Sequence, residues 1–106
     1  MRKITTQAVE AFKNGVEFAS GNTSVIVEGK NVKLTLWGHI VAKRDSKRVW
    51  VSHCGYDTNT TKERLNGVIN EFGNPYEDGI YVRKGVMYIK IDGVEKVMED
   101  KFYRVK

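Results

Sequence analysis

The feature that most constrains how this chain can fold is a series of short strand-like segments joined by very short connections. Residues 32–37 read VKLTLW, in which apolar and polar side chains alternate with the two-residue period of a half-buried β-strand. Similar strand-like segments cover residues 23–28, 39–43 and 48–52, with turn-forming residues between them. Strands joined by so few residues must pair antiparallel. We therefore predict an antiparallel meander over residues 23–52.

Two other segments have the 3.6-residue period of amphipathic helices. The apolar stripe of the first comprises Val9, Phe12, Val16 and Ala19. Thr5 is the predicted N-cap of this helix, and Ser20-Gly21-Asn22 is the predicted stop. The helix is too short to be stable alone, so its apolar stripe must be buried against other elements.

The second helix has the clearest local signal in the chain. Its apolar stripe comprises Leu65, Val68, Ile69 and Phe72. Thr60 and Glu63 have the spacing of a capping box, in which each side chain accepts a hydrogen bond from the backbone N–H of the other residue. Gly73 is predicted to take the left-handed position after the helix, and Pro75 prevents the helix from continuing.

The C-terminal part of the chain again has the pattern of strands. Three further strand-like segments follow, at residues 79–83, 86–91 and 94–98. Lys84-Gly85 and Asp92-Gly93 are hairpin turn signals, and residues 102–105 are a final short strand or a packing tail. The predicted fold class is α+β, with two amphipathic helices packed on a mainly antiparallel sheet of about six to seven strands, a meander plus a C-terminal hairpin. No linker is visible, so we assign residues 1–106 to a single α+β domain.

The positive charge of the chain is concentrated in its first half. The 106 residues include 18 basic and 13 acidic residues, which gives a net charge of +5. Residues 1–53 contain 9 basic and 4 acidic residues, whereas residues 54–106 contain 9 of each. This asymmetry favours an anionic partner, such as nucleic acid, an acidic protein groove or an anionic surface. A net charge of this size is also common in proteins where it serves solubility alone.

Composition and motifs exclude several classes of protein. The single cysteine excludes an internal disulfide framework and a four-cysteine zinc site. Neither phosphate-binding motif, GxxxxGK[ST] or GxGxxG, occurs in the sequence. The longest apolar run, Val86–Ile89, is far shorter than the roughly 20 residues that a membrane helix needs, so we expect no membrane partner. The lone thiol and the lack of an export signal favour a reducing cytoplasm.

Candidate catalytic residues are few. The pairing predicted for residues 39–43 and 48–52 brings His39 near Cys54, and with Asp57 these residues have the composition of a thiol-enzyme site. The same residues with His53 have donors suited to zinc, but no HxxxH, CxxC or HxH spacing supports a metal site. A small strand-end cysteine packed against the second helix explains Cys54 better. We therefore expect no enzymatic activity, no metal and no cofactor.

The remaining candidate is a basic and aromatic constellation within the meander. Its residues, our predicted partner-binding set, are Lys33, Trp37, Lys43, Arg44, Lys47, Arg48 and Trp50. Four of the five cations fall within six residues at a predicted turn, and both tryptophans lie on otherwise polar strand faces, with Lys33 and Trp37 on the same face. Such a surface stacks bases and neutralises phosphates, or provides hot spots for a protein. The alternative is that helices, loops or the terminal hairpin bury both tryptophans.

Several motifs resemble those of a family of small uncharacterised proteins from tailed bacteriophages. The most distinctive is TTKERLNG at residues 60–67. Shorter motifs that carry the resemblance lie at residues 4–12, 21–25, 34–38, 40–43, 49–52 and 84–88. Relatives in that family tend to carry His at the position of Trp37, and the family has no assigned enzymatic activity. The resemblance implies a phage origin and supplies no catalytic residues.

Together these features predict a non-enzymatic, phage-encoded binding protein in the cytoplasm of the host bacterium. The leading expectation is an inhibitor of a host nucleic-acid-handling or defence complex, of the anti-CRISPR or host-takeover kind, whose partner is a host protein or ribonucleoprotein. The alternative is direct binding of RNA or single-stranded DNA by the basic and aromatic hairpin surface. Unpaired sheet edges and the apolar terminal hairpin are also compatible with a homodimer.

Overall fold

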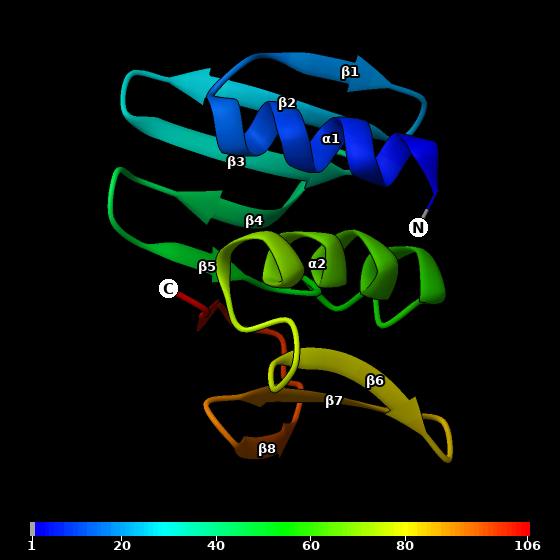
Figure 1. The fold of residues 1–106 in the computed structure, drawn as a ribbon. Coiled ribbons are helices and arrows are strands. Elements are labelled where there is room, and N and C mark those ends of the chain that lie inside the picture. Colours follow the sequence, from blue (N-terminus) through cyan, green and yellow to red (C-terminus); the bar gives the residue numbers. More distant parts are fainter. Residues whose placement is uncertain (1) are drawn as a thin grey trace.

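The larger of two antiparallel sheets in the protein has six strands. The structure is a computed structural model that describes residues 2–106. The strands are β1 (Phe18–Ser20), β2 (Thr23–Glu28), β3 (Asn31–Leu36), β4 (His39–Arg44), β5 (Val49–Val51) and β9 (Tyr103–Arg104). They lie in the spatial order β1-β2-β3-β4-β5-β9 (Figure 1). Strands β2 to β5 follow one another in sequence and in space, so the predicted meander is confirmed.

Both helices lie on the same face of this sheet. Figure 1 shows α1 (Lys3–Asn14) across β2 and β3, and α2 (Asn59–Phe72) beside β4 and β5. The core between helices and sheet is apolar, with Phe12 of α1 and Leu65 of α2 fully buried against Leu34 and Val51. The opposite face of the sheet has no helix over it within the described residues. This open face is where solvent-accessible side chains of the meander gather.

The C-terminal hairpins form a second sheet instead of extending the first. Strands β6 (Gly79–Arg83), β7 (Val86–Ile91) and β8 (Val94–Val97) pair in that order. The α+β class with two helices is confirmed, but the strands form one sheet of six and one of three where we predicted a single sheet. The side chain of Asn66 attaches the smaller sheet to α2, because it accepts from the N–H of Ile80 at 2.7 Å and donates to its carbonyl at 2.8 Å.

The first helix starts earlier and ends earlier than predicted. Its N-cap is Arg2, which makes no side-chain capping bond, so the predicted cap at Thr5 is wrong. The Thr5 side chain is buried and donates a hydrogen bond to Glu63 of α2. At the other end, Gly15 has φ +67° and its N–H bonds the carbonyl of Ala11. The chain therefore leaves the helix before Val16, and residues 18–20 form β1 instead of a last helical turn.

The second helix has the predicted stripe but different caps. Thr58 is the N-cap and accepts a hydrogen bond from the N–H of Thr61 at 3.2 Å, so the predicted cap at Thr60 is wrong. Gly73 has φ −96° and is not left-handed. Space favours glycine there, because a Cβ would lie 3.0 Å from the carbonyl oxygen of Ile69 and 2.9 Å from Oδ2 of Asp78. Both ends of the second helix therefore differ from the caps that the local motifs predicted.

A buried arginine joins the two helices to the sheet. Arg64 of α2 is only 2% exposed. Its guanidinium donates to Oγ1 of Thr5 at 2.6 Å, to Oε1 of Glu63 at 2.7 Å and to Oγ1 of Thr23 at 3.2 Å. These bonds compensate the large cost of removing a charge from water. The network fixes α1, α2 and β2 relative to one another.

Candidate binding surface

A single line of side chains crosses the open face of the six-stranded sheet. Direct cross-strand partners on an antiparallel sheet point to the same face. The register pairs Ile26 with Lys33, Lys33 with Lys43, Lys43 with Trp50, and Trp50 with Arg104. We call Lys33, Lys43, Trp50 and Arg104 the open-face row. One residue from each of four adjacent strands thus brings three cations and an indole into one line.

Two further residues flank the open-face row. Arg48 precedes β5, and its guanidinium carbon lies 5.3 Å from the ring centre of Trp50. Phe102 precedes β9 and is 37% exposed. The ammonium of Lys43 lies between the two aromatic rings, 5.5 Å from the centre of Trp50 and 4.2 Å from that of Phe102. These are cation–π distances, so the rings hold the Lys43 ammonium in place beside the sheet.

The cations of this surface differ in whether a carboxylate already neutralises them. Lys33 forms an ion pair with Glu28, and Arg48 forms one with Asp45 at 3.0 Å. Lys43 has no carboxylate within ion-pair distance in residues 2–106, whereas Nε of Arg104 donates to the main-chain oxygen of Lys106 at 3.1 Å. Hydrogen bonds from the backbone N–H groups of residues 47 and 48, reinforced by the Arg48 side chain, hold the pKa of Asp45 below its ordinary value. Lys43 is therefore the cation of the row without an oxygen partner among the described residues, and the partly exposed Lys33 and the exposed Arg104 extend the positive charge on either side of it.

Arg44 lies apart from the open-face row, although it follows Lys43 directly in sequence. It pairs with Val32 and Val49, whose side chains face the helices. Its Nε donates to the carbonyl of Phe12 at 2.7 Å, and Nη2 donates to that of Lys13 at 2.9 Å. Both acceptors belong to the last turn of α1, where a cation is favoured by the helix dipole. Burial lowers the pKa of Arg44, but a guanidinium remains protonated. Arg44 is thus a structural cap for α1.

Lys47 and Trp37 also lie outside the row. Lys47 is exposed in the turn between β4 and β5. We predicted that Trp37 shares the face of Lys33, and this is wrong. Trp37 lies in the two-residue turn between β3 and β4, at the end of β3 away from Lys33. Trp37 has φ +50° and Gly38 has φ +80°, the signs that a type I′ turn requires. Four of the seven predicted residues thus lie on or beside the open face of the sheet, namely Lys33, Lys43, Arg48 and Trp50.

Trp37 belongs to a separate aromatic group. It is 48% exposed, and its ring centre lies 6.1 Å from that of Tyr56. The hydroxyl of Tyr56 lies 3.0 Å from Nε2 of His39. Trp50 is half-buried. Neither indole is sealed in the core, so the alternative in which both tryptophans are buried is wrong.

The candidate thiol site does not assemble in the structure. Sγ of Cys54 contacts the carbonyl of Ile40 at 2.7 Å, and His39 is directed to Tyr56. His53 is buried, with Nε2 at 3.0 Å from the carbonyl of Met98 and Nδ1 accepting from the N–H of Gly55. Residues 2–106 contain no group of three or more metal-ligating side chains.

Two surface residues were missing from the predicted set. Phe102 and Arg104 lie beside and within the row because β9 pairs with β5. Strand β9 has only two residues, and the residues it pairs with lie 52 and 54 positions earlier in the chain. The alternation of Phe102, Tyr103, Arg104 and Val105 is a strand signal, but nothing in it indicates which strand receives it.

The fold and this surface define a small α+β protein whose most distinctive exposed feature is a basic and aromatic sheet face. The chain belongs to the Kyanoviridae Gp96 protein family, whose model matches residues 1–105. This is a phage protein family, in agreement with the predicted phage origin. No curated protein and no solved structure matches the chain. Within residues 2–106, neither helix has the length and apolar character needed to cross a bilayer.

Proposed function

We propose that this phage protein is a non-enzymatic binding protein that holds single-stranded nucleic acid on the open face of its six-stranded sheet. The open-face row carries the proposal, because it combines three cations with an aromatic ring in one cross-strand line. Proteins that bind single strands combine a basic track for the phosphates with aromatic rings on which bases stack. The row has both components within four neighbouring strands.

The placement of Lys33 and Lys43 supports a role outside folding. They are direct cross-strand partners, and like charges at that position destabilise a sheet. The Glu28 carboxylate relieves the repulsion only from the side of Lys33. A row of cations that the fold does not need is expected where an external polyanion completes the charge balance.

The register also sets a direction for the bound strand. Neighbouring β-strands lie about 4.8 Å apart, so the line from Lys33 to Arg104 extends roughly 14 Å across the sheet. A sugar–phosphate chain running along this line, perpendicular to the β-strands, places successive phosphates near Lys33, Lys43 and Arg104. Bases of the same chain then reach the rings of Trp50 and Phe102, which lie between and beside those cations.

The test is oligonucleotide binding by a triple variant and a matched control. The first variant carries Lys33→Gln, Lys43→Gln and Arg104→Gln, and the control carries Lys3→Gln, Lys62→Gln and Lys84→Gln, which are remote from the row and change the net charge equally. Fluorescence anisotropy with labelled single strands measures affinity against salt concentration. We expect the row variant to reduce the salt slope by about 2, because each lost phosphate contact on a single strand contributes about 0.7. Equal slopes in the two variants would refute this assignment of the row.

A second candidate is inhibition of a host nucleic-acid-handling complex through a protein contact. The observation that favours it is that Trp50, Arg48 and Phe102 lie close together on the surface. Tryptophan and arginine are enriched among the residues that dominate protein interfaces. The ion pair of Arg48 with Asp45 also gives the rim of this surface mixed charge, as protein interfaces have. Affinity capture from host lysate separates the candidates. A host protein retained after nuclease treatment and lost in the row variant would support inhibition.

A further inference from the structure

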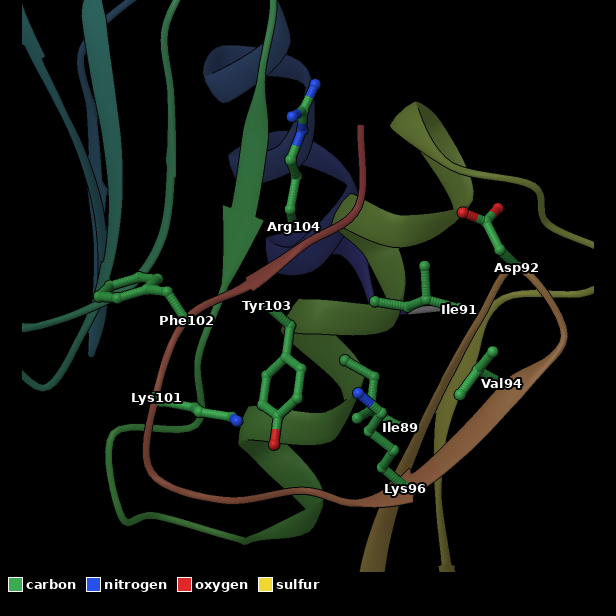
Figure 2. Close-up of a pocket in the computed structure, with 9 residues that line it drawn as sticks. All are labelled: Ile89, Ile91, Asp92, Val94, Lys96, Lys101, Phe102, Tyr103 and Arg104. Carbon is green, nitrogen blue, oxygen red and sulfur yellow. The ribbon is translucent and has the colours of Figure 1, made fainter.

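We propose that the groove beside β9 is a second nucleotide subsite, which receives the continuation of the strand bound by the open-face row; this inference rests on the proposed function. The groove has a volume of about 430 Å³ and lies between the β7–β8 hairpin and the C-terminal segment (Figure 2). Residues that line it include Ile89, Ile91, Val94, Lys96, Lys101 and Tyr103. Its volume is in the range of sites that hold small molecules, roughly 300–1,000 Å³.

The chemistry of the lining suits a nucleotide. Ile89, Ile91 and Val94 supply apolar surface on the hairpin side, and the ring of Tyr103 stands opposite on the C-terminal side (Figure 2). Lys96 and Lys101 add cations, one from each side, with Lys101 in an exposed ion pair with Glu99 at 3.4 Å and Asp92 adding one carboxylate to the lining. A base is flat and apolar on its faces, while its phosphate is anionic, so apolar walls and an aromatic ring beside two ammonium groups complement both parts.

The aromatic side of the groove is held in place before any ligand arrives. The hydroxyl of Tyr103 accepts a hydrogen bond from the N–H of Glu99 at 2.8 Å, and its backbone pairs with Val51 of β5. On the opposite side, Ile89 is 2% exposed and therefore fixed by the core. A preformed site loses little conformational freedom on binding, which favours affinity.

Two residues connect this groove to the open-face row. Phe102 and Arg104 both line the groove. Phe102 also contacts Lys43, and Arg104 is the last member of the row. Figure 2 shows the Phe102 ring directed away from the groove and toward the larger sheet. A chain that leaves the row over the edge strand β9 therefore passes directly into the groove.

A second copy of the protein fits this region less well. In a symmetric dimer, two copies of one edge strand can pair antiparallel only about a two-fold axis perpendicular to the sheet. The residue at the axis then lies directly opposite the same residue of the second copy. Self-pairing of β8 about its centre would then place Glu95 opposite Glu95, or Lys96 opposite Lys96, of the second copy. Like charges in direct opposition destabilise such a pairing. The excess of cations around the groove instead complements an anionic chain.

The experiment compares oligonucleotides of different length on paired variants. The groove variant carries Lys96→Gln and Lys101→Gln, and its control carries Lys84→Gln and Lys90→Gln, which remove the same charge from the same C-terminal region but do not line the groove. Labelled oligothymidylates of about 4, 8 and 12 nucleotides cover the usual range of single-strand site sizes. We expect the groove variant to bind the longest oligonucleotide about tenfold more weakly than the control does, through loss of two phosphate contacts. The shortest oligonucleotide, which the open-face row accommodates alone, should bind both variants equally.

Each alternative has a distinct outcome. Equal binding of the longest oligonucleotide by groove variant and control would overturn the groove proposal and leave the row intact. An equal loss for short and long oligonucleotides would also overturn it, because a general charge effect has no dependence on length. If an oligoglutamate peptide binds the wild type through Lys96 and Lys101 while long oligonucleotides do not need them, the groove is a protein-docking site. Absence of binding to any oligonucleotide at low salt would refute the proposed function itself, and the subsite with it.

Discussion

The two faces of the six-stranded sheet use the same kinds of cation for different purposes. On the helix side, Arg44 and Arg64 direct their guanidinium groups to protein carbonyl, carboxylate and hydroxyl oxygens. On the open side, Lys43 has no carboxylate partner among residues 2–106 and lies against the rings of Trp50 and Phe102, while Arg104 donates to the main-chain oxygen of Lys106. Lys43 and Arg44 are neighbours in sequence, yet strand parity sends them to opposite faces. The cations that cluster in this sequence therefore have two roles. Those on the helix side stabilise the fold, and those on the open side are exposed to a binding partner.

The largest expected effect comes from the helix side. Arg64→Met keeps much of the volume of the buried side chain but removes its charge and its donors. Glu63, Thr5 and Thr23 then lose their common partner, and we expect a loss of about 3–5 kcal/mol in the free energy of unfolding. Urea denaturation followed by far-ultraviolet circular dichroism measures this. The control Lys62→Met lies next to this network in α2, and a similar loss there would show that Arg64 has no special structural role.

The adjacent pair Lys43 and Arg44 tests the comparison most directly. Arg44→Gln removes charged hydrogen bonds to the last turn of α1, so stability should fall by about 2 kcal/mol while oligonucleotide affinity of the folded fraction is retained. Lys43→Gln should do the opposite, with stability changed by less than about 0.5 kcal/mol and affinity reduced. Both quantities are measured on both variants. If Lys43→Gln is the more destabilising change, the division between the two faces is wrong.

A smaller effect distinguishes the observed helix cap from the predicted one. Thr58→Ala removes the oxygen that accepts the N–H of Thr61, and we expect a loss of about 1 kcal/mol in the free energy of unfolding. Thr60→Ala removes no cap and should change stability by less than about 0.5 kcal/mol. Thermal unfolding of the two variants side by side decides between them, and a larger effect at Thr60 would restore the capping box.

Patterns that depend on neighbouring residues predicted most of the fold. The alternation at residues 32–37 and the stripe of Leu65, Val68 and Ile69 are consequences of burying one face of a strand or helix. Caps were less predictable, because Thr5 and Glu63 satisfy each other across 58 positions instead of their own helix ends. A side chain with hydrogen-bonding capacity goes where tertiary structure offers a partner, and a local motif cannot indicate that.

The binding surface was predictable only in part for a similar reason. Lys33, Lys43 and Trp50 follow from strand parity once the meander is known. Trp37 was assigned to the wrong face because the turn begins one residue earlier than the alternation indicated. Arg104 joins the row through the pairing of a two-residue strand with β5, and the local alternation that predicts this strand does not indicate its partner.

The smallest expected effect concerns the acidic rim of the open face. Asp45 accepts the backbone N–H groups of Lys47 (2.8 Å) and Arg48 (2.7 Å), and these bonds together with the Arg48 side chain lower its pKa. A carboxylate with a lowered pKa in the folded state contributes stability above its unfolded pKa of about 3.9, and this contribution is lost as the pH falls through the folded value. Asp45→Asn should therefore lose stability less steeply than the wild type below about pH 4, as measured by urea denaturation across that range.

The same substitution has the opposite sign for binding, which makes it a sharp test of the comparison. The amide retains an oxygen for the two backbone donors but no longer neutralises Arg48, whose guanidinium lies 5.3 Å from the centre of Trp50. We expect oligonucleotide affinity to rise about two- to threefold at low salt, and the gain to disappear as screening shortens the range of the charge to less than about 10 Å. Asp57→Asn is the matched control, since it makes the same charge change in the loop before α2. If both variants gain equally, the open face attracts anions only through net charge, and the open-face row has no specific part in binding.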